Sequence, residues 1–350
     1  MKIRGVLCVL LWCLVAESAM AGLQFDYMRG VFSGDLAFMT TLSDDDRASP
    51  LYQRFQSRFV ERQTPENWAD IDDDFVYRAA LHYRDYWVAA LLNPAQHDQA
   101  EQALRQAIQT LIIDGGESAG DGDPLDQLQT SIRARGWGFQ GGRTPPLQDF
   151  MLWRNDELMA FEVELHDTVQ AVQVHMMDDF ISQGWANFAT FGHSGTGGWA
   201  DREALYCMRD SYDLQSERFL VSYLKHEGRH FADFIRFPEL KSADLEYRAK
   251  LTELIFAEQT LHALFQQFTG HANMQSTAPH ALANAYLLDR MQQALVDIGS
   301  LDESDIAANW WQNVPADAIE QVARQLLDEH EAALENDGAM TTHGVLEPEG

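Results

Sequence analysis

The chain has 350 residues, 46% of them hydrophobic, which is enough to bury the core of one large domain or of two ordinary ones. Its 54 acidic residues outnumber its 25 basic residues and give a formal charge of −29. Such a charge opposes binding to nucleic acid and to anionic membrane surfaces, so neither is expected as a partner.

Residues 1–21 are predicted to be a secretory signal peptide. A short basic start precedes an apolar run over 5–16 that is too short to span a bilayer comfortably, and residues 19–21 read Ala-Met-Ala, as signal peptidases require. An uncleaved anchor is the alternative. No later apolar run suits a membrane helix, so we expect an exported, periplasmic or secreted protein without a stable membrane span. Cys207 alone lies beyond the signal, so no internal disulfide is expected.

Residues 22–145 are predicted to form a helical N-terminal region. Apolar and aromatic residues recur at three- and four-residue steps over 75–92 and over 98–113, and Asn-Pro at 93–94 separates the two segments. This pair resembles a helical hairpin of the tetratricopeptide kind, but no second copy follows at a fixed period. We expect these helices to pack on the rest of the chain. Binding of a protein partner through them is the alternative.

Two glycine-rich stretches, 114–125 and 136–146, are expected to be loops, and the second places a domain boundary near residue 145. Beyond it, alternating apolar residues and a high Val content predict a small sheet. The predicted strands are 161–165, 169–177, 184–192 and 204–208. The glycine-rich turn at 193–199 is expected either to close a hairpin at the sheet edge or to overhang an active-site cleft.

Residues 226–230 read His-Glu-Gly-Arg-His within a helical pattern that Asp213 or Ser216 can cap and that ends before Pro238. A second helix is predicted to begin with Ser242 as its cap and to run to residue 257. Helical patterns then continue to about residue 333. The breaks fall at Gly270, Pro279, Gly299 and Pro315.

The two histidines of this motif can bind one metal ion. His226 and His230 are four residues apart, so a helix places their imidazoles on one face, one turn above each other. Glu227 can reach a water held on the same ion and accept its proton.

This H-E-x-x-H helix lies after a strand-rich segment and before a second acidic helix, and it resembles the gluzincin branch of the zincin metallopeptidases. The resemblance implies an α+β, predominantly helical fold, in which a zincin-like domain over 146–335 carries a small sheet and the motif helix. Residues 336–350 are expected to be a flexible tail. The metzincin pattern is excluded because Asp233 and Arg236 replace its glycine and third histidine.

The resemblance also implies a glutamate on the next helix as the third zinc ligand. Glu246 and Glu253 follow His230 by 16 and 23 residues. Glu246 is favoured because it begins Glu-Tyr-Arg-Ala, which is similar to the E-x-x-A of many zincin second helices, and Glu253 is the alternative. Asp233 lies on the His226 face, where it can orient a zinc-bound histidine as a second-shell carboxylate. A surface aspartate is the equal alternative.

A histidine or tyrosine donor for the developing oxyanion is a further implication of the resemblance. His193 is the first choice, because it lies in the glycine-rich turn before the motif. The other candidates are Tyr206, Tyr212, His271 and His280.

The expected function is therefore an exported zinc-dependent metallopeptidase that hydrolyses amide bonds of a peptide or protein substrate. Zn²⁺ would be held by His226, His230 and Glu246, with Glu227 as general base. Peptide, protein and peptidoglycan substrates are not distinguished. One alternative is a catalytically inactive zinc-containing protein of the cell envelope that binds a peptide or partner. Another is an all-helical scaffold whose histidines bind no metal.

Overall fold

A computed structural model describes residues 22–118, 122–200, 203–306, 309–336 and 346. The expected signal peptide, and all of the expected tail except residues 336 and 346, lie outside this part. The chain divides into two compact units. The first comprises Met1–Asp156 and Met177–Thr196, and the second comprises Glu157–Met176 and Gly197–Gly350. This division differs from a single boundary near residue 145, because two long strands pass from the first unit into the second.

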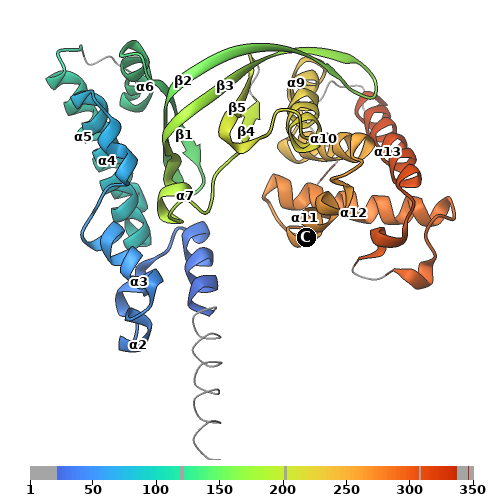
Figure 1. Ribbon diagram of the computed structural model, residues 1–350, viewed down its shortest axis with the longest axis horizontal. Helices are drawn as coiled ribbons and strands as arrows, with labels where there is room; N and C mark the ends of the chain where they lie inside the picture. Colours follow the sequence, from blue (N-terminus) through green and yellow to red (C-terminus); the bar gives the residue numbers. More distant parts are fainter. Residues whose placement is uncertain (1–21, 119–121, 201–202, 307–308, 337–345, 347–350) are drawn as a thin grey trace, which may run out of the picture. The chain divides into compact units, whose positions relative to one another are not determined.

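The first unit is built mainly from helices (Figure 1). After a helix over residues 22–33 come α2 (Asp44–Arg47), α3 (Pro50–Phe55), α4 (Asp74–Leu92), α5 (His97–Asp114) and α6 (Pro124–Ala134). α4 and α5 confirm the helices expected over 75–92 and 98–113. The Asp73 side chain caps α4 by accepting a hydrogen bond from the Val76 N–H, and the helix ends at Leu92, before Pro94.

The core of the first unit is centred on α4. Trp87 is fully buried, donates its indole N–H to the Gln148 carbonyl at 2.8 Å, and lies 5.2 Å from the Phe188 ring. Tyr83 packs on Phe150 with ring centroids 4.8 Å apart. These contacts join α4 to Gln148 and Phe150, near the start of the second strand, and to Phe188. The core of the first unit therefore needs both of the sequence stretches that form the unit.

One five-stranded sheet runs in the order β1-β2-β3-β5-β4. Its strands are β1 (Gly138–Thr144), β2 (Leu147–Glu164), β3 (Val169–Gln183), β4 (Gly198–Ala200) and β5 (Leu205–Met208). β5 and the far parts of β2 and β3 agree with the predicted strands. β4 pairs antiparallel with β5, so the turn before it leads into an edge strand.

Two sequence predictions in this part of the chain are wrong. Residues 136–146 were expected to be a loop, but β1 pairs with β2 from Gly138↔Trp153 to Thr144↔Leu147. The glycines of this strand hide its alternation, which rests largely on the buried Phe139. Residues 184–192 were expected to be a strand, but Gly184–Ala189 forms α7. Gly184 has φ +87°, and the Asp149 carboxylate accepts the next backbone N–H, so the chain leaves the sheet.

The second unit contains the motif helix. Ser216 caps α8 (Glu217–Phe219) by accepting from the Phe219 N–H, and a π-helical segment (Leu220–Lys225) leads directly into α9 (His226–Arg236). The expected start at Ser216 and the end before Pro238 are thus confirmed. Ser242 does not cap the next helix, since α10 (Ser242–Phe256) begins at Ser242 itself with Lys241 at the cap position.

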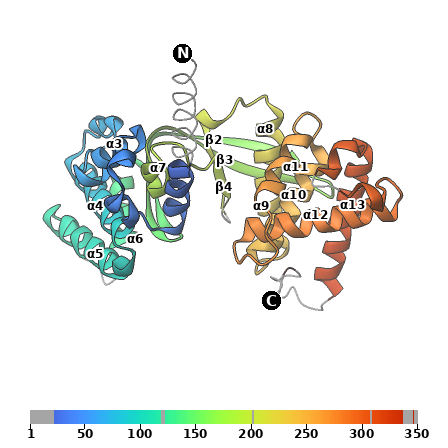
Figure 2. The same cartoon turned by 90° about the horizontal axis from the view of Figure 1, so that it is seen from below.

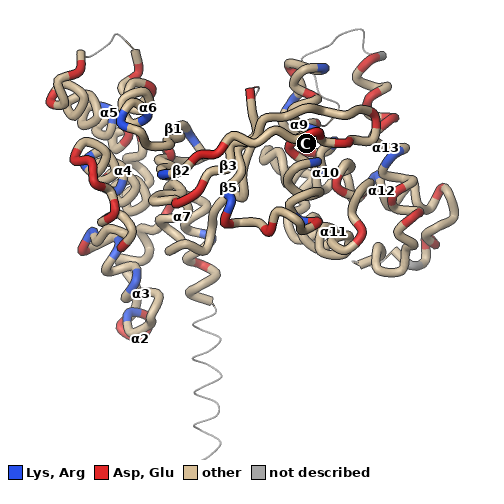
Figure 3. Tube along the Cα trace, turned by 45° about the horizontal axis from the view of Figure 1, so that its top comes forward, with Lys and Arg blue, Asp and Glu red and all other residues tan. Residues whose placement is uncertain are grey.

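Helix α10 is the centre of the second unit. It contacts α9, α12 (Pro279–Asp297) and α13 (Ala316–Asn336), while α11 (Leu261–Gly270) packs on α12 (Figure 2). Every residue from Ala243 to Ile255 is buried, including five charged ones. Acidic residues otherwise occur along the elements of both units (Figure 3). Within the described residues, no helix combines the length and apolarity needed to cross a bilayer.

Candidate metal centre

His226, His230 and Glu246 converge in the second unit. Each offers one ligand atom, these atoms lie within 4.8 Å of one another, and all three residues are buried. Nε2 of His226 is 3.7 Å from Oε2 of Glu246, and Nε2 of His230 is 3.3 Å from Oε1 of Glu246. Two imidazole nitrogens and a carboxylate at this separation can hold a metal ion.

The backbone around the motif explains how the two helices approach. The π-helical segment Leu220–Lys225 widens the turn immediately before His226, and such segments often occur at functional sites. Gly228 is the position where α9 meets β2, because a Cβ there would lie only 3.0 Å from Cγ1 of Val163. A larger residue at position 228 would push the motif helix away from the sheet.

Glu253 occupies the outer side of His226. Its Oε1 lies 2.7 Å from Nδ1 of that histidine, which leaves Nε2 to face Glu246. A carboxylate on the outer nitrogen fixes the tautomer and the ring orientation of a metal-binding histidine. The structure thus separates the two candidate third ligands: Glu246 belongs to the group that could hold a metal ion, and Glu253 contacts His226 from its outer side.

The electrostatics of the group follow from this crowding of carboxylates. Burial lowers the pKa of His226, but the negative charges of Glu253, Glu246 and Glu227 outweigh it and raise that pKa to about 9. Burial raises the pKa of Glu246, yet the neighbouring histidines His230 and His226 hold it well below its usual value. Because a histidine binds a metal ion in its neutral form, protonation of His226 competes with metal binding by this group.

Glu227 is positioned differently from the other carboxylates. It is half-buried beside His226 and makes no hydrogen bond or ion pair with another described residue. Its negative charge is felt by Tyr212, whose pKa burial chiefly raises, to about 12. The carboxylate is therefore available to accept a proton from a water.

Of the proposed oxyanion donors, the structure brings His280 to the group. Its Nδ1 lies 2.8 Å from Oε2 of Glu246, at the first turn of α12, and its side chain is 70% exposed. Lys250 lies 3.6 Å from the same oxygen. The first choice, His193, belongs to the other unit, and none of its described contacts involves the group. His271 contacts the Gln267 carbonyl at the end of α11.

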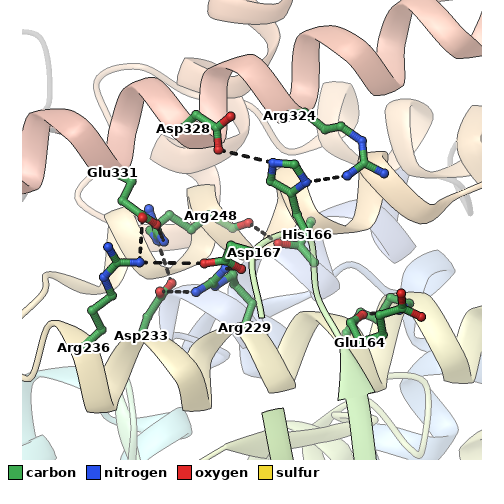
Figure 4. Close-up of polar contacts among 12 residues, drawn as sticks. Glu164, His166, Asp167, Arg229, Asp233, Arg236, Arg248, Arg324, Asp328 and Glu331 are labelled. Carbon is green, nitrogen blue, oxygen red and sulfur yellow. Dashed lines mark hydrogen bonds and ion pairs between the residues drawn. The ribbon is translucent and has the colours of Figure 1, made fainter. Parts of the chain in front are cut away.

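Asp233 does not contact either motif histidine. It is fully buried and lies 2.8 Å from Nε of Arg248 and 2.9 Å from Nη2 of Arg229 (Figure 4). The expectation of a carboxylate behind a zinc-binding histidine is met by Glu253 instead. Asp233 lies seven residues after His226, and Glu253 lies seven residues after Glu246, so each shares a helical face with a candidate ligand. Sequence spacing alone could therefore not tell which carboxylate contacts a histidine.

Asp233 is the centre of a wider ion-pair network between α9, α10 and α13. Arg248 also donates to Glu331 at 3.0 Å, and Glu331 lies 2.6 Å from Arg236 (Figure 4). Arg229 reaches Asp167, in the turn between β2 and β3, at 2.7 Å. The network joins α9, which carries the two histidines, to α10, which carries Glu246. It therefore fixes the position of one helix relative to the other.

Comparisons with protein-family models, with curated proteins and with solved structures gave no match to this chain.

Proposed function

We propose that this chain is a zinc-dependent metallopeptidase. The observation that carries the proposal is the buried group of His226, His230 and Glu246, next to which Glu227 makes no ion pair with any residue that the structure describes. Two histidines and one carboxylate are a common ligand set of catalytic zinc, which keeps its fourth position open. Glu253 adds the outer carboxylate that such histidines usually have.

The chemistry follows from the roles that these residues can take. Zinc in the group would lower the pKa of a bound water and polarise a substrate carbonyl. Glu227 would accept a proton from the attacking water while the water oxygen bonds to the carbonyl carbon. Glu227 would then deliver that proton to the amine nitrogen as the C–N bond breaks. His280, 2.8 Å from Glu246 and largely exposed, is a candidate to donate a hydrogen bond to the oxyanion.

The edge strand beside the motif helix suits an extended substrate. β4 ends the sheet and packs on α9. Gly197 and Gly198 let this strand lie close to two tyrosines, since a Cβ at Gly197 would be 2.2 Å from the Tyr212 hydroxyl and one at Gly198 2.5 Å from Cε2 of Tyr223. A peptide can add to such an edge through main-chain hydrogen bonds. We infer a peptide or protein substrate, and a site of action outside the cytoplasm if residues 1–21 direct export.

The variant Glu227→Gln tests the proposal. Zinc content, measured by inductively coupled plasma mass spectrometry, should stay at one ion per chain, because residue 227 is not a ligand. Cleavage of a broad peptide library should fall by about 10²- to 10⁴-fold, since the proton acceptor is gone. Glu239→Gln, at an exposed position in the turn after α9, is the matched control and should cleave normally.

Two outcomes would contradict the proposal. Wild-type turnover in Glu227→Gln would exclude the general-base role. Stoichiometric zinc in a wild-type protein that cuts neither the library nor peptidoglycan peptides would favour a zinc-containing binding protein instead.

A further inference from the structure

The first unit contains a cavity of about 210 Å³ that the metal centre does not use. At about 30 Å³ per water, this is room for roughly seven waters, or for one small organic group. The wall combines the aromatic residues Trp68, Phe180, Phe188 and Phe191 with the polar residues Asn67, Ser182, Gln183 and Asn187. Arg58 supplies the positive charge of the lining. Aromatic rings beside a charged group and several hydrogen-bonding side chains suit a small ligand that has both an apolar and a polar part.

Arg58 is held in place mainly by rings. Its guanidinium carbon lies 4.7 Å from the Phe188 ring centroid and 5.6 Å from that of Phe191. Its Nη1 donates to the Phe188 carbonyl at 3.1 Å. Among the described residues it contacts no carboxylate. Most of its N–H groups therefore remain available to an acceptor from outside.

Arg54 repeats this arrangement one turn earlier. Its guanidinium lies 4.4 Å from the Phe191 centroid, it contacts the Phe191 carbonyl at 3.3 Å, and it also contacts no carboxylate within the described part of the chain. Elsewhere in the same unit Arg105 pairs with Glu101 and Arg135 with Glu117. In a chain with 54 acidic residues, two neighbouring arginines that stack on aromatic rings without an acidic partner favour an anion from another molecule.

We propose that this cavity binds the C-terminal residue of a peptide that ends in an aromatic or branched apolar side chain. The carboxylate would accept two parallel hydrogen bonds from the edge of the Arg58 guanidinium, which already lies close to the Phe188 and Phe191 rings. The apolar side chain would lie against Trp68 and Phe180, which line the same cavity. Arg54 would add to the positive potential without direct contact. This inference does not depend on the metal centre.

Calorimetric titration of the full chain in EDTA tests the proposal, since EDTA removes any binding through a metal. The probes are N-acetyl-phenylalanine, its amide, and the tripeptide Ala-Ala-Phe. Both acids should bind, and the amide should bind at least tenfold more weakly because it lacks the charge. Equal binding of acid and amide, or no binding of either acid, would overturn the proposal. This comparison uses the wild-type chain and depends on no substitution.

Variants of Arg58 then test whether the ligand binds in this cavity. Arg58→Gln should weaken binding of N-acetyl-phenylalanine at least tenfold. Arg58→Lys should bind with intermediate affinity, because it keeps the charge and loses the planar pair of donors. Arg47→Gln removes the same charge from an exposed position of the first unit outside the cavity lining and should bind within twofold of wild type. Wild-type affinity in a folded Arg58→Gln variant, or equal loss in Arg47→Gln, would contradict the assignment.

Discussion

The central helices of the two units, α4 and α10, are both buried, but they bury different kinds of side chain. The buried residues of α4 are all apolar or aromatic, and its charged side chains lie at least partly in solvent. Helix α10 buries Asp244, Glu246, Arg248, Lys250 and Glu253. Each of these has a partner: for instance, Asp244 lies 2.9 Å from His330, and Arg248 lies 2.8 Å from Asp233.

This difference separates side chains that stabilise a unit from side chains that position their neighbours. An apolar helix such as α4 is stabilised by the burial of apolar surface area and by packing, neither of which requires specific pairs of atoms to meet. A buried ion pair contributes little net stability, but removing one partner is costly. The charged residues of α10 are therefore better explained by position than by stability: two of its carboxylates face His226, and Arg248 ties α10 to the motif helix.

The largest effect is expected from Asp233→Ala. The substitution leaves the buried Arg229 and Arg248 without their shared carboxylate, so the free energy of unfolding should fall by about 3–5 kcal/mol. Urea unfolding followed by circular dichroism measures this. Asp26→Ala breaks an exposed pair with Arg29 and should cost about 0–1 kcal/mol. A similar small loss in both variants would show that the buried network does not hold α10.

Trp87→Ala tests the apolar side of the comparison. Loss of this fully buried ring should reduce the free energy of unfolding by about 3–5 kcal/mol through the cavity that it leaves. Zinc content of the folded protein should be unchanged, because Trp87 contributes packing in the first unit only. Loss of zinc well below the melting temperature of this variant would mean that the two helices are not independent in function.

Glu253→Gln should have a smaller effect, on metal affinity. The amide keeps the shape and removes the charge behind His226, so zinc affinity measured by competition with a chelator should fall about 10–100-fold. Glu246→Gln should reduce it further, since residue 246 supplies a ligand atom. If Glu253→Gln were the more severe of the two, the roles assigned to these carboxylates would be reversed.

The last prediction concerns the reactivity of a buried thiol and not the stability of the fold. Burial raises the pKa of Cys207 to about 12, so at pH 8 only about one thiol in ten thousand is ionised. We expect a disulfide reagent to label Cys207 at least 100-fold more slowly in the folded protein than in urea. Cys207→Ser serves to subtract the signal of Cys8 and Cys13. Fast labelling of the native protein would show that β5 opens readily.

The sequence predicted the helices better than it predicted the sheet. Repeats of three and four residues identify α4, α5 and α9 directly, and the spacing of His226 and His230 is itself a helical repeat. β1 was missed because glycine leaves no side-chain pattern. α7 was mistaken for a strand because its aromatic residues favour strands, whereas Gly184 and Asp149 turn the chain into a helix.

The parts of the site that could not be predicted depend on tertiary contacts. Glu246 and Glu253 share one face of a helix, so only their depth relative to His226 distinguishes a ligand from its support. His280 meets Glu246 across 34 residues of sequence, and no local pattern marks it. Arg248 pairs with Asp233 and Glu331, which lie 15 and 83 residues away in the sequence, so no local pattern marks this pairing.

The interleaved order of the two units has a consequence for biosynthesis. The first unit needs residues 177–196, so it cannot close until they have left the ribosome. Until then the surface of Trp87 that will meet Phe188 stays open to water and to other nascent chains. Because each unit is formed by two stretches of sequence, cleavage of the chain at a single position cannot release either unit intact.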